Sequence, residues 1–193
     1  ASGDGFDTLS GIENVLAGSG ADSILGDAQA NILDGSTGNN TLSGAAGNDT
    51  LIGNTGADCL AGGLGNDSLF GSSATDWVSY IAASGAVTVD LNGSLGFATG
   101  ADGNDTLSSI ENVQGGNFTD SLIGDSLANS LDGGLGADTL VGNFGLDTLI
   151  GGLGNDSLSG GADTLDWASY LNASGAVTVD LAAGTTSGAD GND

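Results

Sequence analysis

The sequence predicts an all-β protein in which short strands and tight turns alternate along the chain. One apolar residue recurs every nine residues between Ile24 and Val78, and an acidic or amide residue stands two positions before each of them. Glycine supplies 38 of the 193 residues, and proline is absent. A helix has no nine-residue period, whereas apolar-centred triplets between glycine-rich hexapeptides suit a strand followed by a turn. Glycine provides the positive φ angles that such turns need.

The nine-residue step runs without interruption from residue 17 to residue 79. In a representative step, GGLGNDSLF (62–70), the glycine-rich hexapeptide precedes a triplet with Leu69 at its centre. We expect the central apolar residues to point inward and to form a thin common core. These residues are Ile24, Leu33, Leu42, Leu51, Leu60, Leu69 and Val78, followed in the second half of the chain by Leu122, Leu131, Leu140, Leu149 and Leu158.

The chain consists of two copies of one larger unit. The clearest repeats are DTLSGIENV (7–15) with DTLSSIENV (105–113), and DWVSYIAASGAVTVDL (76–91) with DWASYLNASGAVTVDL (166–181). We therefore expect one continuous solenoid over residues 1–193, with a first unit at 7–104 and a second at 105–193. The second unit lacks one nine-residue step, so the step is itself a structural module. We also expect the chain to be a piece of a longer tandem array.

The composition excludes most partners and most catalytic chemistry. The chain has 25 acidic residues, no Lys, Arg or His, and a single Cys. It cannot neutralise phosphates, so nucleic acids and anionic membranes are not expected partners. It has no Ser-His-Asp site, no His-based zinc site and no internal disulfide, and we expect no enzyme activity. Carboxylate, amide and carbonyl oxygens remain, and these are the ligands of hard cations such as Ca²⁺.

Two steps, GGLGNDSLF (62–70) and GGLGNDSLS (151–159), fit every fixed position of the pattern GGxGxDxUx, where U is a large apolar residue. The chain thus resembles the RTX (haemolysin-type) calcium-binding repeats. The resemblance implies a right-handed parallel β-roll or β-solenoid with two nonapeptides per coil, so that each turn lies on the turn 18 residues later. The IENV and DWxSY segments do not fit the step, and we expect wider irregular coils there.

The resemblance further implies that several Ca²⁺ ions lie between successive turns, held by turn carbonyls and by the acidic or amide side chains. The candidate ligands are Asp22, Asn40, Asp49, Asp58, Asp67, Asp76, Asp105, Asp120, Asp138, Asp147, Asp156 and Asp166. The alternative is that these side chains only cap turns by hydrogen bonding. We expect weaker or empty sites where an amide replaces the carboxylate, and we expect packing rather than metal binding in GDAQAN (26–31) and GDSLAN (124–129).

The segment after DWVSY has a different pattern. Val87, Val89 and Leu91 alternate with polar residues, which predicts a strand with one buried face. Two interpretations suit the aromatic residues of both copies. They could form a stacking platform that binds a sugar or a neighbouring rod, or they could cover the thin core. These aromatic residues are Trp77, Tyr80, Trp167 and Tyr170. The two glutamates, Glu13 and Glu111, share one sequence context, which indicates repeated architecture rather than a catalytic pair.

These features predict a calcium-binding structural β-roll of a secreted protein, such as an adhesin stalk, a surface-layer protein or a filament. The alternative is an accessory or secretion module of a secreted enzyme whose catalytic domain lies elsewhere. The resemblance implies secretion from a Gram-negative-type bacterium by type I secretion, with folding on Ca²⁺ outside the cell. Further copies of the repeat, stacked end to end or laterally, are the expected protein partners. No apolar segment is long enough to span a bilayer.

Overall fold

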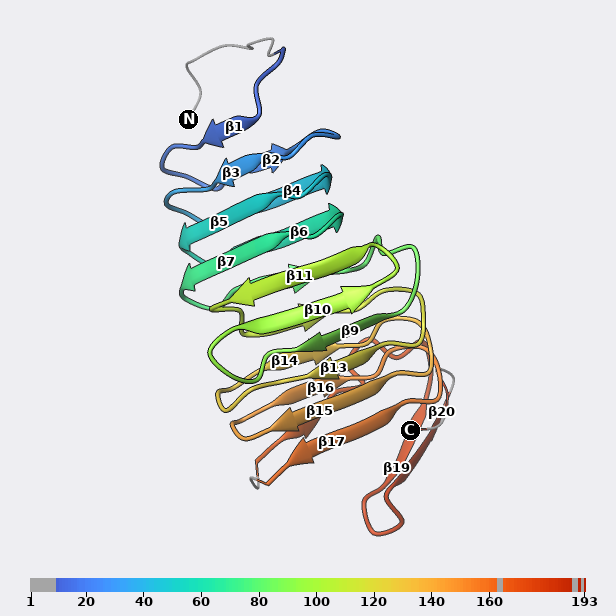
Figure 1. Cartoon of the computed structure of the whole chain (residues 1–193). Coiled ribbons are helices and arrows are strands. Elements are labelled where there is room, and N and C mark those ends of the chain that lie inside the picture. The colour runs from blue at the N-terminus through green and yellow to red at the C-terminus, as the bar shows by residue number, and fades with distance from the viewer. Residues whose placement is uncertain (1–9, 163–164, 189–190, 192) are drawn as a thin grey trace.

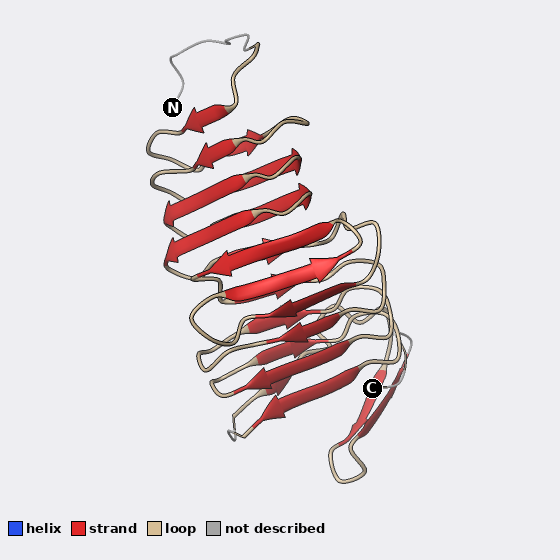
Figure 2. Cartoon of the chain, in the orientation of Figure 1, coloured by secondary structure: helices blue, strands red, loops and turns tan. Residues whose placement is uncertain are grey.

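The computed structural model describes residues 10–162, 165–188, 191 and 193. These residues form two long sheets that run along the molecule, joined by turns (Figure 1). The described chain contains strands and loops and no helix, as Figure 2 shows. The all-β solenoid that the sequence predicts is therefore confirmed. Residues 7–9, where we place the beginning of the first unit, lie outside the described residues.

The strands alternate between the two sheets. In spatial order, sheet A contains β1 (Asn14–Leu16), β3 (Ile32–Asp34), β5 (Thr50–Thr55), β7 (Ser68–Ser73), β11 (Gly103–Ser108), β10 (Gly96–Gly100), β9 (Val87–Asp90), β13 (Ser121–Ile123), β15 (Thr139–Asn143) and β17 (Ser157–Gly161). Sheet B contains β18 (Trp167–Ala168), β16 (Thr148–Ile150), β14 (Ser130–Asp132), β12 (Asn112–Gln114), β8 (Trp77–Ser79), β6 (Cys59–Leu64), β4 (Thr41–Ala46) and β2 (Ser23–Leu25). Both sheets continue from the first unit into the second.

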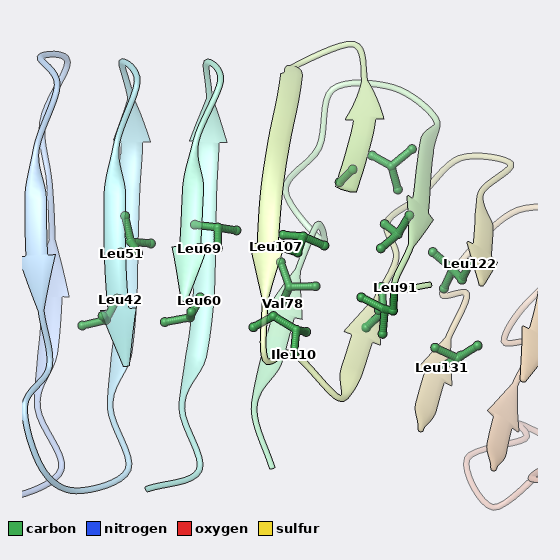
Figure 3. Close-up of a cluster of buried hydrophobic side chains, with 14 of the residues drawn as sticks. Leu42, Leu51, Leu60, Leu69, Val78, Leu91, Leu107, Ile110, Leu122 and Leu131 are labelled. Carbon is green, nitrogen blue, oxygen red and sulfur yellow. The ribbon is translucent and has the colours of Figure 1, made fainter. Parts of the chain in front are cut away.

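The register of the parallel pairs confirms two nonapeptides per coil. Leu33 pairs with Leu51 in sheet A, and Leu42 pairs with Leu60 in sheet B. Each central apolar residue therefore lies directly on its counterpart in the next coil. The side chains of the two sheets point toward one another and fill the space between them (Figure 3). Ten of the predicted core residues are buried, namely Leu33, Leu42, Leu51, Leu60, Leu69, Val78, Leu122, Leu131, Leu140 and Leu149.

An antiparallel meander of β9, β10 and β11 interrupts the regular coils. β11 pairs in parallel with β7, and β9 pairs in parallel with β13. β10 lies between them and is antiparallel to both β9 and β11. Sheet A thus has ten strands against eight in sheet B, which lengthens it by about 10 Å. The predicted strand is confirmed, because Val87 and Val89 are buried in β9 while Thr88 is exposed.

The two segments outside the nonapeptide pattern flank the meander, which makes this coil wider than the others, and each of them also contributes a regular strand to sheet B. The DWVS segment lies in β8 and leads into the ordered meander. The IENV segment places Ile110 and Val113 in the core, and β12 pairs in register with both β8 and β14. These segments depart from the nonapeptide in sequence and still complete sheet B, because their strands satisfy the hydrogen-bonding groups of the neighbouring coils.

A third sheet contains only β19 (Val177–Asp180) and β20 (Thr185–Gly188), which are antiparallel. This hairpin lies beside the end of the solenoid near the C-terminus (Figure 1). Its sequence repeats that of β9, yet Val179 is 48% exposed where Val89 is 0% exposed. The burial of this segment therefore depends on pairing with sheet A.

Candidate metal centre

Each nonapeptide places its acidic or amide residue at the end of the turn, just before the strand triplet. This side chain joins its own coil to the preceding one. Oδ1 of Asp49 accepts the backbone N–H of Asn31 (2.7 Å), and Oδ1 of Asp67 accepts that of Asp49 (2.8 Å). The same bond recurs at 18-residue spacing along both edges of the solenoid. The side chains therefore form two columns, as the two-nonapeptide coil predicts.

We call these columns ladder A and ladder B, after the sheet whose strands they precede. Ladder A contains Asn31, Asp49, Asp67, Asp105, Asp120, Asp138, Asp156 and Asp193. Ladder B contains Asp22, Asn40, Asp58, Asp76, Glu111, Asn129, Asp147 and Asp166. All twelve candidate ligands of the sequence analysis lie in these two ladders.

The second carboxylate oxygen of most ladder aspartates is buried. In the part of the chain that the structure describes, this Oδ2 has no hydrogen-bond partner in Asp22, Asp49, Asp58, Asp67, Asp76, Asp138 and Asp156. A buried carboxylate oxygen without a partner is costly, because it has lost its hydration. The chain has no Lys, Arg or His to compensate the charge. At neutral pH, a cation from solution can compensate it.

The first glycine of each step leaves room beside this oxygen. A Cβ at Gly44 would collide with Oδ2 of Asp49 and would lie 2.6 Å from the carbonyl oxygen of Gly62 in the next coil. Gly133 lies in the same way against Asp138 and the carbonyl oxygen of Gly151. A carboxylate oxygen of one coil and a carbonyl oxygen of the next therefore border one small space. Carboxylate and carbonyl oxygens are the donor set that Ca²⁺ prefers.

The remaining candidate ligands differ from these aspartates. Asn40 donates its amide to the carbonyl oxygens of Gly35 (3.0 Å) and Gly38 (3.1 Å). The second carboxylate oxygen of Asp105 and of Asp120 accepts a hydrogen bond from the protein. Asp166 accepts the N–H of Asp147 (3.1 Å), as a ladder residue should. The structure thus brings all the candidates into the ladders. They differ in whether the second carboxylate oxygen, or the amide group, already has a hydrogen-bond partner in the protein.

The two variant turns close on themselves. In GDAQAN (26–31), the N–H of Asp27 donates to Oδ1 of Asn31 (2.8 Å), and the Asn31 amide donates to Oδ1 of Asp27 (3.3 Å). In GDSLAN (124–129), the N–H of Asp125 donates to Oδ1 of Asn129 (2.8 Å). These turns satisfy their side chains by internal hydrogen bonds, in agreement with the expected preference for packing.

The sequence analysis missed Glu111 as a member of ladder B. In the coil after the meander, a glutamate stands where most other coils have an aspartate or an asparagine, and Oε2 of Glu111 accepts the N–H of Asp76 (2.8 Å). Because β12 keeps its register with β8, Glu111 stands directly at the ladder position. The signal available in the sequence was the position of Glu111 two residues before Val113, which matches the spacing of every ladder residue from its core residue.

Burial changes the acidity of the ladder carboxyl groups. Loss of hydration raises the pKa of Asp67, Asp76 and Asp138 to about 6, against the opposing effect of a backbone hydrogen bond. Neighbouring carboxylates in the same column add to the increase, as Asp105 and Asp49 do for Asp67. Burial likewise raises the pKa of Asp49 and Asp58. The folded ladder therefore holds protons more tightly than the unfolded chain when no metal is bound.

Acidification should consequently stabilise the calcium-free fold. The pKa of Asp67, Asp76 and Asp138 is about 6 in the folded protein, whereas the ordinary value of an aspartate is 3.8. Between these two pH values the folded state binds more protons than the unfolded state. The stability of the calcium-free fold therefore falls as the pH rises from 3.8 through 6. We expect circular dichroism of dialysed, calcium-free protein to show more β-structure at pH 5 than at pH 7. A double variant, Asp67→Asn with Asp138→Asn, should reduce the difference. Identical spectra at the two pH values would contradict the expectation.

Side chains alone do not complete a metal site. Within the described ranges, no three or more His, Cys, Asp or Glu residues gather closely enough to hold a metal ion. Any cation in the ladders would need backbone carbonyl oxygens for the rest of its coordination shell, and Ca²⁺ accepts such ligands.

Among the residues that the structure describes, no helix has the length and apolar character needed to cross a membrane.

Comparison with known families gives a result that agrees with this geometry. The family model described as the RTX calcium-binding nonapeptide repeat (4 copies) matches residues 2–42, 34–69, 43–78, 114–149 and 132–164. Together these matches cover more than half of the chain. The segment that they leave out between residues 78 and 114 contains the meander. Comparison with curated proteins gives no match.

Proposed function

Because the chain belongs to the family of RTX calcium-binding nonapeptide repeats, we propose that it is a calcium-rigidified rod that serves a structural role in an extracellular protein. The observation that supports this function best is the series of ladder aspartates whose Oδ2 is buried without a partner. These oxygens face the space beside the first glycine of the step. A rod built on them is stable only when cations compensate the charge.

The proposed ligands are the ladder aspartates of the regular nine-residue steps. They are Asp22, Asp49, Asp58, Asp67, Asp76, Asp138, Asp147 and Asp156, with turn carbonyls such as those of Gly62 and Gly151. In six of the ladder aspartates, Oδ1 accepts the N–H of the preceding coil and Oδ2 remains for the cation; these are Asp49, Asp58, Asp67, Asp76, Asp138 and Asp156. Bound Ca²⁺ would supply positive charge between coils. Asn40, whose amide is already used, would bind weakly or not at all.

The proposed location is outside the cell, and the proposed route is type I secretion from a Gram-negative-type bacterium. Extracellular calcium modules bind with dissociation constants of about 10⁻⁴–10⁻³ M, so such sites stay empty in the cytosol and fill outside. A chain with a net charge of −25 and no cationic side chain repels itself until the cation arrives. Coupling of folding to calcium would thus confine the rigid rod to the exterior.

We propose a stalk, surface layer or filament in preference to an accessory module of an enzyme, and we propose that the module has no catalytic activity. Stacking of one unit on another already occurs within the chain, because β9 pairs with β13 and β8 pairs with β12 across the junction. The same contacts would allow further copies to extend the rod, and calcium would be required to overcome the repulsion between like-charged units.

The proposed function is tested by comparing two ladder residues. Asp67→Ala removes a buried carboxylate in a fully matched turn, whereas Asn40→Ala removes an amide that is already paired with the protein. We expect the calcium midpoint for folding, followed by circular dichroism, to rise at least about tenfold for Asp67→Ala, as the loss of one charged ligand implies. The shift for Asn40→Ala should be smaller. Equal shifts, or no dependence on calcium in the unmodified chain, would contradict the proposal.

A further inference from the structure

We infer that the meander is a metal-free joint in the rod, in which Tyr80 takes the place of a cation at Asp105. The inference rests on the proposed function, since it states which ladder positions bind calcium. It divides the calcium sites into two blocks, one from Asp22 to Asp76 and one from Asp138 to Asp156. Between these blocks, hydrogen bonds from the protein satisfy both oxygens of Asp105 and of Asp120.

The contacts of Asp105 are complete without metal. Its Oδ1 accepts the N–H of Asp67 (3.0 Å), the same bond that joins Asp67 to Asp49. Its Oδ2 accepts the hydroxyl group of Tyr80 (2.9 Å). Asp105 is 7% exposed, and the Tyr80 ring packs against the hydrophobic core. Oδ2 has no hydrogen-bond partner in Asp67, whereas in Asp105 it accepts a hydrogen bond from the hydroxyl group of Tyr80.

The glycine of this step also has other neighbours than in a regular step. In a regular step, the glycine five residues before the ladder aspartate faces the carboxylate, as Gly62 faces Asp67. The residue at this place before Asp105 is Gly100, which lies in β10. A Cβ at Gly100 would lie nearest to the carbonyl oxygen of Ala86 (2.8 Å) and the side chain of Val87 (3.1 Å). In this step the glycine therefore packs against Ala86 and Val87, because β10 pairs with β9.

Asp120, the ladder A residue on the other side of the meander, also has both carboxylate oxygens hydrogen-bonded to the protein. Oδ1 of Asp120 accepts the N–H of Val87 (2.8 Å), the first residue of β9. Its Oδ2 accepts the N–H of Gly116 (2.7 Å). Both carboxylates that adjoin the meander in ladder A therefore have a protein partner on each oxygen. We extend the inference to Asp120, where backbone N–H groups replace the cation.

The second unit contains the same tyrosine–aspartate pair. Tyr170 and Asp193 are the counterparts of Tyr80 and Asp105; burial raises the pKa of Tyr170, and the nearby carboxylate of Asp193 adds to the increase. Oδ1 of Asp193 accepts the N–H of Asp156 (3.0 Å), as Oδ1 of Asp105 accepts that of Asp67. The pair is thus part of the repeated architecture, and it gives the tyrosine of the DWxSY segment a role as an internal donor. Tyr80 covers the core, as one of the two alternatives for these aromatic residues predicts.

Two matched substitutions test the inference in the full chain. Asp67→Asn and Asp105→Asn each retain Oδ1 for the ladder hydrogen bond and remove the charge from the second position. In Asp105→Asn, the new amide can donate to the Tyr80 hydroxyl group, which also accepts hydrogen bonds, so the fold should persist. We expect calorimetric titration with Ca²⁺ to give the stoichiometry of the unmodified chain for Asp105→Asn and one ion fewer for Asp67→Asn.

Loss of an ion in Asp105→Asn, with the fold intact by circular dichroism in calcium, would overturn the inference while leaving the proposed function in place. An unmodified chain that binds no calcium would instead overturn the proposed function. If Asp105→Asn does not fold, Tyr80→Phe provides the second measurement. We expect Tyr80→Phe to lower the melting temperature by the same amount at low and at saturating calcium, because no ion depends on the hydroxyl group. A decrease that disappears at saturating calcium would contradict the metal-free joint.

Discussion

In excess chelator at neutral pH, the chain should lose its β-structure, and it should regain it in millimolar Ca²⁺. The ladders bring like charges together in columns, and the folded protein buries carboxylate oxygens that have no partner. The thin core cannot offset these costs, because each coil contributes only one central apolar residue from each sheet. Binding of cations and folding should therefore occur as one coupled transition.

Circular dichroism during a calcium titration measures this transition. Sodium chloride at matched ionic strength is the control, because salt screens the repulsion between exposed charges without entering a calcium site. We expect the control to restore little β-structure. A spectrum already rich in β-structure in chelator, or equal recovery in sodium chloride, would show that the ladders do not require a bound cation.

Substitution of Gly65 by alanine should severely destabilise the calcium-bound protein. Gly65 has a φ angle of +137°, and a Cβ at this residue would collide with the carbonyl oxygen of Gly47 in the preceding coil. Both the strained backbone and the contact with a rigid neighbouring turn oppose the substitution. We expect a loss of about 3 kcal/mol or more in the free energy of unfolding, in the range of other strain and overpacking effects.

Gly18→Ala is the matched control for this substitution. A Cβ at Gly18 has no atom within 4 Å, and its φ angle lies outside the left-handed region. Its effect on stability should remain within about 0.5 kcal/mol, as for ordinary surface substitutions. Denaturant unfolding at saturating calcium compares the two variants with the unmodified chain. Similar midpoints for Gly65→Ala and Gly18→Ala would mean that the coils do not stack as closely as the structure indicates.

The sequence by itself determined the features that repeat at a constant interval. The nine-residue period placed Leu42 on Leu60 and aligned Asp49 with Asp67, because a parallel coil brings residues of equal phase together. The turn glycines and the ladder residues could be assigned in the same way. Each of these features depends on local conformation and on one repeated spacing, so every further step of the chain supported the same interpretation.

Only the tertiary structure decided what happens where the period is interrupted. The pairing of β11 with β7, the contact of Tyr80 with Asp105, and the position of Glu111 join segments whose spacing follows no repeat. The identical segments GAVTVDL at 85–91 and 175–181 show why the sequence could not specify these outcomes. In the first unit this segment lies between β10 and β13 and buries its valines, whereas in the second unit it pairs only with β20. The burial of a strand is set by the strands available to pair with it, and this depends on long-range contacts that no local pattern records.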